Sequence, residues 1–100
     1  MSAPTPLTIT TNPNGLMASG AIDAHTAPML ADALAECSDD TVVLDLAEID
    51  FVDSSGLRVL IEAHQNAEES GRALHLANVS GSVNRLLEIS GVSDYLHVID

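Results

Sequence analysis

Apolar positions along the chain follow two periods, one typical of strands and one typical of helices. Short apolar or β-branched runs predict strands at residues 7–11, 16–19, 41–46, 73–77 and 96–99. Apolar residues recurring every three to four positions predict helices at residues 26–37, 54–67 and 80–90, with Thr26 and Ser80 as the expected N-caps of the first and third. The expected order of elements is therefore β-β-α-β-α-β-α-β.

The pattern also predicts how these elements assemble. Asn12-Pro13-Asn14-Gly15 is a strong turn signal, which makes the first two strands an antiparallel hairpin at the edge of a sheet. The run Thr-Val-Val-Leu-Asp-Leu at 41–46 is typical of a central strand buried on both faces. Strands that alternate with helices imply right-handed crossovers onto a mostly parallel sheet. We expect one α/β domain over residues 7–100, with residues 1–6 as a flexible leader.

Composition and charge narrow the range of partners. The 100 residues carry 15 acidic and three basic side chains, a formal net charge of −12, and 46% hydrophobic residues. Such a surface repels nucleic acid and anionic membranes and favours a protein partner with a basic docking face. No apolar run reaches the ~20 residues of a membrane span, and the start of the chain lacks a signal-peptide pattern. We expect a soluble, cytoplasmic protein in which the single cysteine, Cys37, is a buried structural thiol.

Motifs for metal binding, cofactor binding and catalysis are absent from the sequence. None of the four histidines, at positions 25, 64, 75 and 97, has a histidine or cysteine neighbour at ligand spacing. There is no G-x-S-x-G elbow, Walker loop or G-x-G-x-x-G run. The sequence therefore predicts no metal, no cofactor and no enzymatic activity. A small serine hydrolase remains a minor alternative.

The segment Phe51-Val52-Asp53-Ser54-Ser55-Gly56-Leu57 is the leading candidate site. A strand ends there and a helix begins, and a helix N-terminus presents unpaired N–H groups and a positive dipole end that suit a phosphate. Asp23 follows the second strand as Asp53 follows the third, so both carboxylates are expected at the same edge of the sheet. Asp23 and Asp53 can act both as helix caps and as the frame of a docking surface around Ser54, whereas local sequence alone favours a capping role for Ser54 and Ser55 over phosphorylation.

Gly56 adds one further indication. Glycine within the first helical turn is unfavourable for the helix by up to ~1 kcal/mol relative to alanine. It suits a position that another backbone approaches closely. We therefore interpret Gly56 as a residue that lets a partner approach.

Four segments together resemble a known family. They are Gly20-Ala21-Ile22-Asp23, Val43-Leu44-Asp45-Leu46, Phe51 to Leu57, and Val83-Asn84-Arg85-Leu86-Leu87-Glu88-Ile89-Ser90-Gly91. In this order and spacing the sequence is similar to STAS domains of the anti-sigma-factor antagonist type. The resemblance covers nearly the whole chain, and the predicted order of strands and helices agrees with that family's fold.

The resemblance implies a regulatory function. Ser54, or as second choice Ser55, corresponds to the serine that an anti-sigma factor with GHKL-type kinase activity phosphorylates. The unmodified protein would bind the anti-sigma factor and free a sigma factor, and a PP2C-type phosphatase would reset the modified form. The partner-binding residues implied are Asp23, His25, Thr26, Asp53, Ser54, Ser55 and Gly56. We expect a monomer or weak dimer.

The chain departs from this family in one respect, and one alternative function stays open. Family members usually continue into a fourth C-terminal helix, which the sequence up to Asp100 does not contain. The alternative is a STAS subunit of another assembly, such as a lipid-transport complex or a stress-sensing particle, again acting as a protein-binding module.

Overall fold

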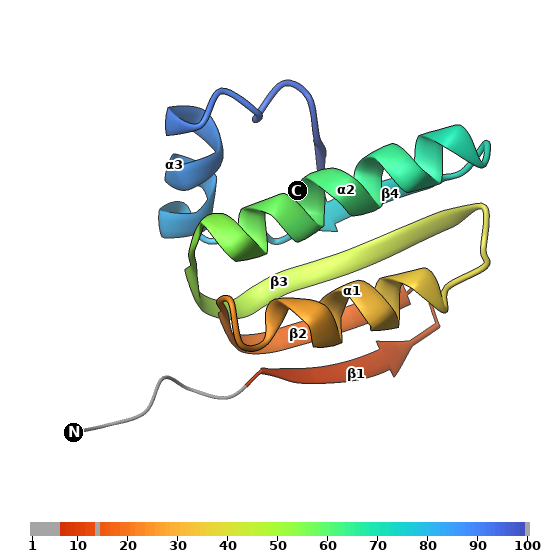
Figure 1. Cartoon of the computed structure of the whole chain (residues 1–100), viewed down its shortest axis with the longest axis horizontal. Helices are drawn as coiled ribbons and strands as arrows, with labels where there is room; N and C mark the ends of the chain where they lie inside the picture. Colours follow the sequence, from red (N-terminus) through yellow and green to blue (C-terminus); the bar gives the residue numbers. More distant parts are fainter. Residues whose placement is uncertain (1–6, 14, 100) are drawn as a thin grey trace.

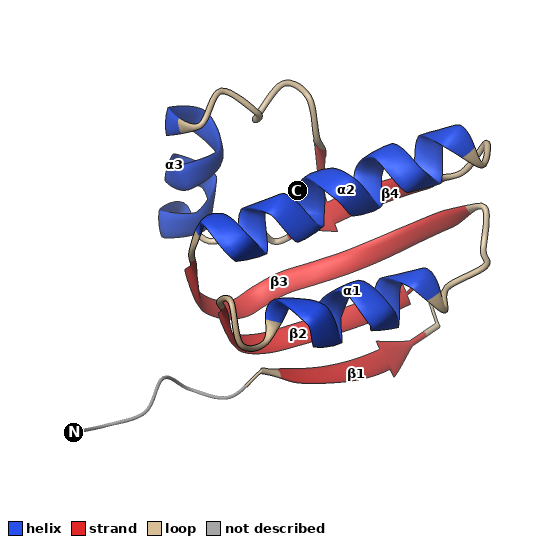
Figure 2. Ribbon diagram, viewed as in Figure 1, coloured by secondary structure: helices blue, strands red, loops and turns tan. Residues whose placement is uncertain are grey.

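The computed structural model describes residues 7–13 and 15–99, so the predicted leader and Asn14 of the turn lie outside the described residues. Five strands and three helices form within the described ranges, in the predicted order (Figures 1 and 2). The elements are β1 (Thr8–Asn12), β2 (Gly15–Ile22), α1 (Ala27–Ala35), β3 (Thr41–Val52), α2 (Ser54–Glu69), β4 (Ala73–Ala77), α3 (Gly81–Ile89) and β5 (His97–Ile99).

The strands form one sheet in the order β1-β2-β3-β4-β5. β1 pairs with β2 in the antiparallel sense, and β3, β4 and β5 each pair in parallel with the strand before them. This confirms the predicted edge hairpin and the mostly parallel sheet. The carboxyl ends of the parallel strands therefore lie at one end of the molecule, on the left in Figure 1.

The hydrophobic core lies between the sheet and the helices. α1 and α2 run side by side across one face of the sheet, and α3 packs against β3 (Figure 1). Burying each large aliphatic side chain stabilises the fold by about 1.5–3 kcal/mol, so the aliphatic core compensates for the scarcity of aromatic residues. The most deeply buried leucines are Leu30, Leu44, Leu46, Leu60, Leu76 and Leu87.

β3 differs from the prediction in length and in burial. It continues without interruption from Thr41 to Val52, whereas the sequence predicted a strand at 41–46. It is also not buried on both faces, because Leu44 and Leu46 are fully buried while Val43 and Asp45 between them are only half-buried. The helices cover one face of the sheet, so the nearly continuous apolar run packs fully on that face alone.

β2 is also longer than predicted, and its pairing with β3 explains the difference. Residues 20–22 were expected to leave the strand, yet they stay paired with β3 up to Ile22 and Val52. Two register shifts occur along this pair, and in both the extra residue is in β3. Each extra residue reverses the alternation of inward and outward side chains, so the two together restore it, and Phe51 faces outward like Val43 and Asp45, with 51% exposure.

Two of the three described helices, α2 and α3, begin at the predicted capping residues. Asp53 caps α2 and Ser80 caps α3, each by accepting backbone N–H bonds from the first turn. Gly71 follows the end of α2 with φ of +73°, a left-handed conformation that glycine adopts without strain. Within the described ranges, none of the helices combines the length and the apolar character needed to cross a membrane.

Candidate functional site

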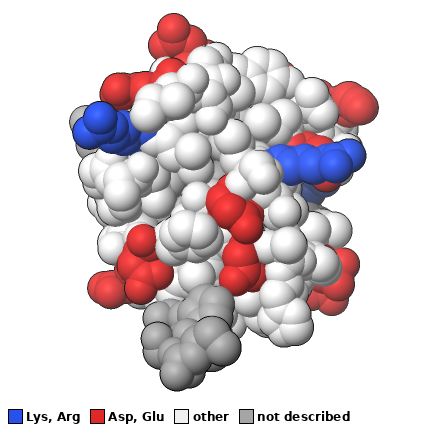
Figure 3. All heavy atoms as spheres, turned by 60° about the vertical axis from the view of Figure 1, so that its left-hand side comes forward, with Lys and Arg blue, Asp and Glu red and all other residues white. Residues whose placement is uncertain are grey.

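The predicted site lies where β2 and β3 end next to each other. Ile22 and Val52 are paired across the two strands, and the Asp53 N–H donates to the Ile22 carbonyl oxygen at 3.1 Å. Asp23 and Asp53 therefore follow neighbouring strand ends, as the sequence predicted. Figure 3 shows this end of the molecule, where acidic side chains are spread over the surface and basic ones lie toward its margins.

Asp53 is the N-cap of α2. Its Oδ1 accepts hydrogen bonds from the N–H groups of Ser55 at 2.8 Å and Gly56 at 3.1 Å. A cap of this kind is typically worth ~1 kcal/mol because it satisfies N–H groups that have no partner within the helix. The capping interpretation of Asp53 is therefore confirmed, and the carboxylate is held in a fixed position beside Ser54.

Ser54 and Ser55 differ in how accessible they are. Ser54 is the first residue of α2 and is exposed, whereas Ser55 is half-buried. Within residues 7–13 and 15–99, the Ser54 hydroxyl forms no hydrogen bond. This hydroxyl can therefore be reached and modified without breaking an existing interaction, which favours Ser54 over Ser55.

Arg58 lies one helical turn beyond Ser54, at the i+4 position. Its side chain is 79% exposed, and its Nε lies 3.5 Å from the Glu62 carboxylate. Residues four apart on a helix are neighbours on its surface, so this guanidinium is within reach of a group attached to Ser54. Arg58 was not among the predicted site residues, although its four-residue spacing from Ser54 was a signal for it.

Gly56 is buried within the protein instead of facing a partner. A Cβ at this position would lie 2.7 Å from Ile22 Cγ2, 2.8 Å from the Ile22 carbonyl oxygen and 2.9 Å from Val52 Cγ1. The prediction of a close backbone approach is correct, but the backbone that approaches is that of β2. Gly56 therefore sets how closely the start of α2 packs on the strand ends, and it contributes no exposed contact surface.

Asp23 and Thr26 fix the turn between β2 and α1. Asp23 Oδ1 accepts from the N–H groups of His25 at 2.9 Å and Thr26 at 3.0 Å. The N–H group of Thr26, followed by the Thr26 hydroxyl and the His25 N–H, holds the pKa of Asp23 below its usual value, although burial partly opposes this. The turn therefore favours an ionised Asp23 at the end of β2, next to the end of β3 that Asp53 follows.

Thr26 precedes α1, as predicted, but its side chain does not cap the helix. Its Oγ1 lies 2.9 Å from the Ala21 carbonyl oxygen and accepts from the Asp23 N–H at 3.0 Å. The side chain is buried within the turn. Thr26 therefore orients Asp23 and offers little direct contact to a partner, whereas the neighbouring His25 is exposed.

Two exposed apolar side chains lie at the same end of the molecule. Met29, in the first turn of α1, is 45% exposed, and Phe51, near the end of β3, is 51% exposed. Exposed Met and Phe side chains are enriched at protein interfaces because they bury a large area on binding. Met29 lay outside the predicted site, and Phe51, although part of the candidate segment, was not among the predicted partner-binding residues.

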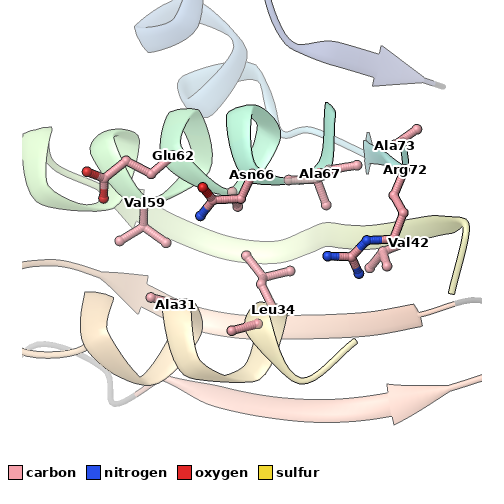
Figure 4. Close-up of a pocket in the computed structure, with 12 residues that line it drawn as sticks. Ala31, Leu34, Val42, Val59, Glu62, Asn66, Ala67, Arg72 and Ala73 are labelled. Carbon is pink, nitrogen blue, oxygen red and sulfur yellow. The ribbon is translucent and has the colours of Figure 1, made fainter. Parts of the chain in front are cut away.

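A separate cavity of about 240 Å³ lies between α1 and α2 (Figure 4). Its lining is mainly apolar, with the Arg72 side chain pointing into it, and it includes none of the predicted site residues. Arg72 Nη1 donates to the Cys37 carbonyl oxygen next to this cavity. Cys37 is half-buried and not fully buried as expected, and partial burial, with a further contribution from Asp39, raises the pKa of its thiol.

Comparisons with known proteins agree with this architecture. An anti-sigma-B factor antagonist of Listeria monocytogenes is 34% identical over 86 residues, covering 83% of this chain and 75% of that protein. A crystal structure of an anti-sigma factor antagonist from Mycobacterium paratuberculosis has a TM-score of 0.79 at 22% identity, covering 98% of this chain and 89% of that chain. The unphosphorylated anti-sigma factor antagonist SpoIIAA has a TM-score of 0.70 at 17% identity, covering 94% and 88%.

Because sequence identity to the two solved structures is low, they show that the fold is shared and no more than that. The family model described as STAS domain matches residues 7–100. This match spans every element of the sheet and helices described above. The chain therefore belongs to the STAS domain family.

Proposed function

We propose that this protein is an anti-sigma factor antagonist controlled by phosphorylation of Ser54. In its unmodified form it binds an anti-sigma factor with GHKL-type serine kinase activity and so releases a sigma factor. Phosphorylation by that kinase ends the binding, and a PP2C-type phosphatase restores it. The protein acts as a cytoplasmic binding module, as a monomer or weak dimer, without a cofactor or an activity of its own.

One observation carries this proposal: an exposed serine, whose hydroxyl forms no hydrogen bond within the described residues, stands at the first position of α2, directly after the Asp53 cap and the neighbouring ends of β2 and β3. The relatives named as anti-sigma-B factor antagonists support the identity of the partner. SpoIIAA, a structural neighbour from Bacillus, has been solved in a phosphorylated form, which supports modification as the means of control.

The phosphate is expected to act on binding and to leave the fold intact. A phosphoserine adds about −1.5 to −2 charge at neutral pH. At a helix N-terminus this charge is stabilising by roughly 0.3–1 kcal/mol, and Arg58 one turn along the helix can compensate part of it. The free protein therefore tolerates the modification.

The bound complex tolerates the phosphate much less well. When a partner excludes water from this surface, a bulky anion at Ser54 must be desolvated beside the Asp23 and Asp53 carboxylates. Exposed Met29 and Phe51 would supply apolar contact area around it. A loss of about hundredfold in affinity corresponds to ~3 kcal/mol, which a few such unfavourable contacts provide.

The proposal is tested by measuring phosphorylation and binding together. Incubation with candidate kinases and ATP, followed by mass mapping, should place the phosphate on Ser54, and Ser54→Ala should remain unmodified. Ser54→Asp should bind the cognate anti-sigma factor about a hundredfold more weakly than wild type while its unfolding free energy stays the same or rises slightly.

Ser82→Asp is the matched control, because Ser82 is also an exposed serine in the first turn of a helix, α3. It should bind the partner as wild type does. Equal affinity of Ser54→Asp and wild type would refute the switch, and a phosphate mapped to a residue other than Ser54 or Ser55 would refute the site.

A further inference from the structure

Three side chains with metal-binding atoms meet toward the C-terminal end of α2, away from Ser54. His64 and Glu68 lie four residues apart on α2, and His97 lies on β5. His64 Nε2 is 3.4 Å from Glu68 Oε1, and His97 Nε2 is 3.7 Å from Glu68 Oε2. One ligand atom from each residue lies within 4.8 Å of the other two.

We propose that His64, Glu68 and His97 bind a divalent transition metal of the zinc class and thereby fasten β5 to α2. In a tetrahedral zinc site the metal–ligand bonds are about 2.0–2.2 Å, which places neighbouring ligand atoms about 3.4 Å apart. The two distances to Glu68, one to each carboxylate oxygen, are 3.4 and 3.7 Å and lie close to this spacing. The separation of up to 4.8 Å closes by a small rotation of the side chains of Glu68 and His97, which are both about half exposed.

His64 provides the fixed side of the site. Its side chain is 2% exposed, and its ring meets that of Tyr95 edge-on with a centroid distance of 4.7 Å. Two ligands at i and i+4 on one helix face project in the same direction, so Glu68 completes a preformed pair with it. Burying a polar imidazole in the core costs free energy unless its nitrogens are paired. A cation bound between His64 and the exposed Glu68 carboxylate would offset part of this cost.

The electrostatic surroundings favour a cation at this place. The C-terminal end of a helix carries a partial negative charge, and the chain as a whole has a formal net charge of −12. Of the three arginines, Arg58 lies beside Glu62 and Arg72 donates to the Cys37 carbonyl oxygen. Within residues 7–13 and 15–99, no arginine pairs with Glu68, so its carboxylate is available to a metal.

The donor atoms select the kind of metal. Two imidazole nitrogens and one carboxylate oxygen suit zinc and its neighbours copper and nickel, whereas calcium and magnesium prefer oxygen ligands alone. Three protein ligands also leave a fourth position open for water. Because His97 is brought in by the last described strand, the metal would act as a clamp between two elements that are distant in sequence.

One feature limits the expected affinity. Coordination through Nε2 leaves the proton of His64 on Nδ1, and this buried nitrogen has no hydrogen-bond partner in the described part of the chain. Zinc-bound histidines usually donate this proton to an acceptor, and loss of that second interaction costs about 10–100-fold in affinity. We therefore expect binding weaker by this factor than at a site with complete second-sphere hydrogen bonds.

The test is titration of the tag-free, metal-stripped full chain with zinc chloride, followed by calorimetry and by NMR of the histidine ring signals. One equivalent should bind, with the ring signals of His64 and His97 shifting while that of the exposed, distant His25 does not. This proposal is independent of the regulation of Ser54, so the two succeed or fail separately.

Variants assign the site. His97→Ala and Glu68→Gln change half-exposed side chains, so both should fold, and each should weaken zinc binding by more than about 10–100-fold, since even second-sphere changes cost that much. Glu69→Gln is the matched control and should bind zinc as wild type does, because Glu69 is an exposed carboxylate next in sequence to Glu68 that does not belong to the cluster.

Three results would overturn the proposal. These are no binding of zinc to the wild-type chain, unchanged affinity in both His97→Ala and Glu68→Gln, and an equal loss of affinity in Glu69→Gln. The last two would mean that zinc associates with the acidic surface in general. His64→Ala is less informative because removal of a buried ring can itself unfold the protein.

Discussion

The two ends of α2 offer opposite chemistry on a single helix of 16 residues. At the N-terminal end, Asp53 accepts hydrogen bonds from two backbone N–H groups. Ser54 is exposed there, where the helix dipole is positive. Toward the C-terminal end the dipole is negative, and His64 and Glu68 meet His97. An added anion is accommodated at the first end and an added cation at the second.

The two ends also differ in what they connect. The start of α2 is held against β2 and β3 in the middle of the sheet, because the Asp53 N–H donates to the Ile22 carbonyl oxygen at 3.1 Å and the packing at Gly56 leaves no room for a Cβ. His64 and Glu68 face β5, a short strand at the sheet edge. About 24 Å of helix separates the ends at 1.5 Å per residue, so a change at one end should leave the other undisturbed.

Zinc gives the largest expected change and acts on the C-terminal end alone. At a concentration one hundred times the dissociation constant, zinc should raise the unfolding free energy of the wild-type chain by about 2.7 kcal/mol. Urea denaturation with and without zinc measures this increase. His97→Ala should show no increase. A similar increase in that variant would mean that zinc does not act through the C-terminal end of α2.

Gly56→Ala is the next largest change and tests how rigidly the N-terminal end is held. The new Cβ would meet the Ile22 carbonyl oxygen and two side chains below 3.0 Å, so α2 must shift. We expect a loss of about 1–3 kcal/mol in unfolding free energy, measured by urea denaturation. Gly81→Ala, where a Cβ meets no atom within 4 Å, is the control and should not destabilise the protein.

Asp53→Ala separates the capping function of Asp53 from its role in partner binding. Removing the cap should cost ~1 kcal/mol of stability. Ser80→Ala removes the corresponding cap of α3, where Ser80 Oγ accepts from the Val83 N–H, and should cost a similar amount. Only Asp53→Ala should also weaken binding of the anti-sigma factor, measured by calorimetry. Equal binding by both variants would assign Asp53 to the fold alone.

The smallest expected effect concerns Asp23 and acid. Because hydrogen bonds lower its pKa in the folded state, Asp23 stabilises the fold above its unfolded-state pKa, and this contribution is lost as the pH falls through the lower, folded-state pKa. Asp23→Asn should therefore flatten the dependence of unfolding free energy on pH in the acidic range. An unchanged pH profile in this variant would show that the turn does not depend on the charge.

The sequence predicted those parts of the molecule that depend on local pattern. The order of elements, the start of α2 at Ser54 and the caps at Asp53 and Ser80 all follow from short-range periodicity and side-chain chemistry. The placement of Asp23 and Asp53 after neighbouring strand ends, at one end of the sheet, followed from the parallel arrangement of β2 and β3.

Features set by long-range packing were not predicted. The extra residues in β3 become visible only against β2, so the two register shifts had no local signal. Gly56 was correctly read as a point of close approach, but only the fold identifies Ile22 as the neighbour. Sequence spacing gave no reason to join His97 to His64, because their proximity arises from the docking of β5 beside β4.

The shortness of β5 has a consequence for local motion. Its three residues are all exposed, and in the described part of the sheet they pair with β4 alone. Elements with few buried contacts open at a free energy well below that of global unfolding. Hydrogen exchange should therefore detect β5 leaving the sheet while α2 and β3 remain closed, so the sheet edge can unfold and refold many times within the lifetime of one native molecule.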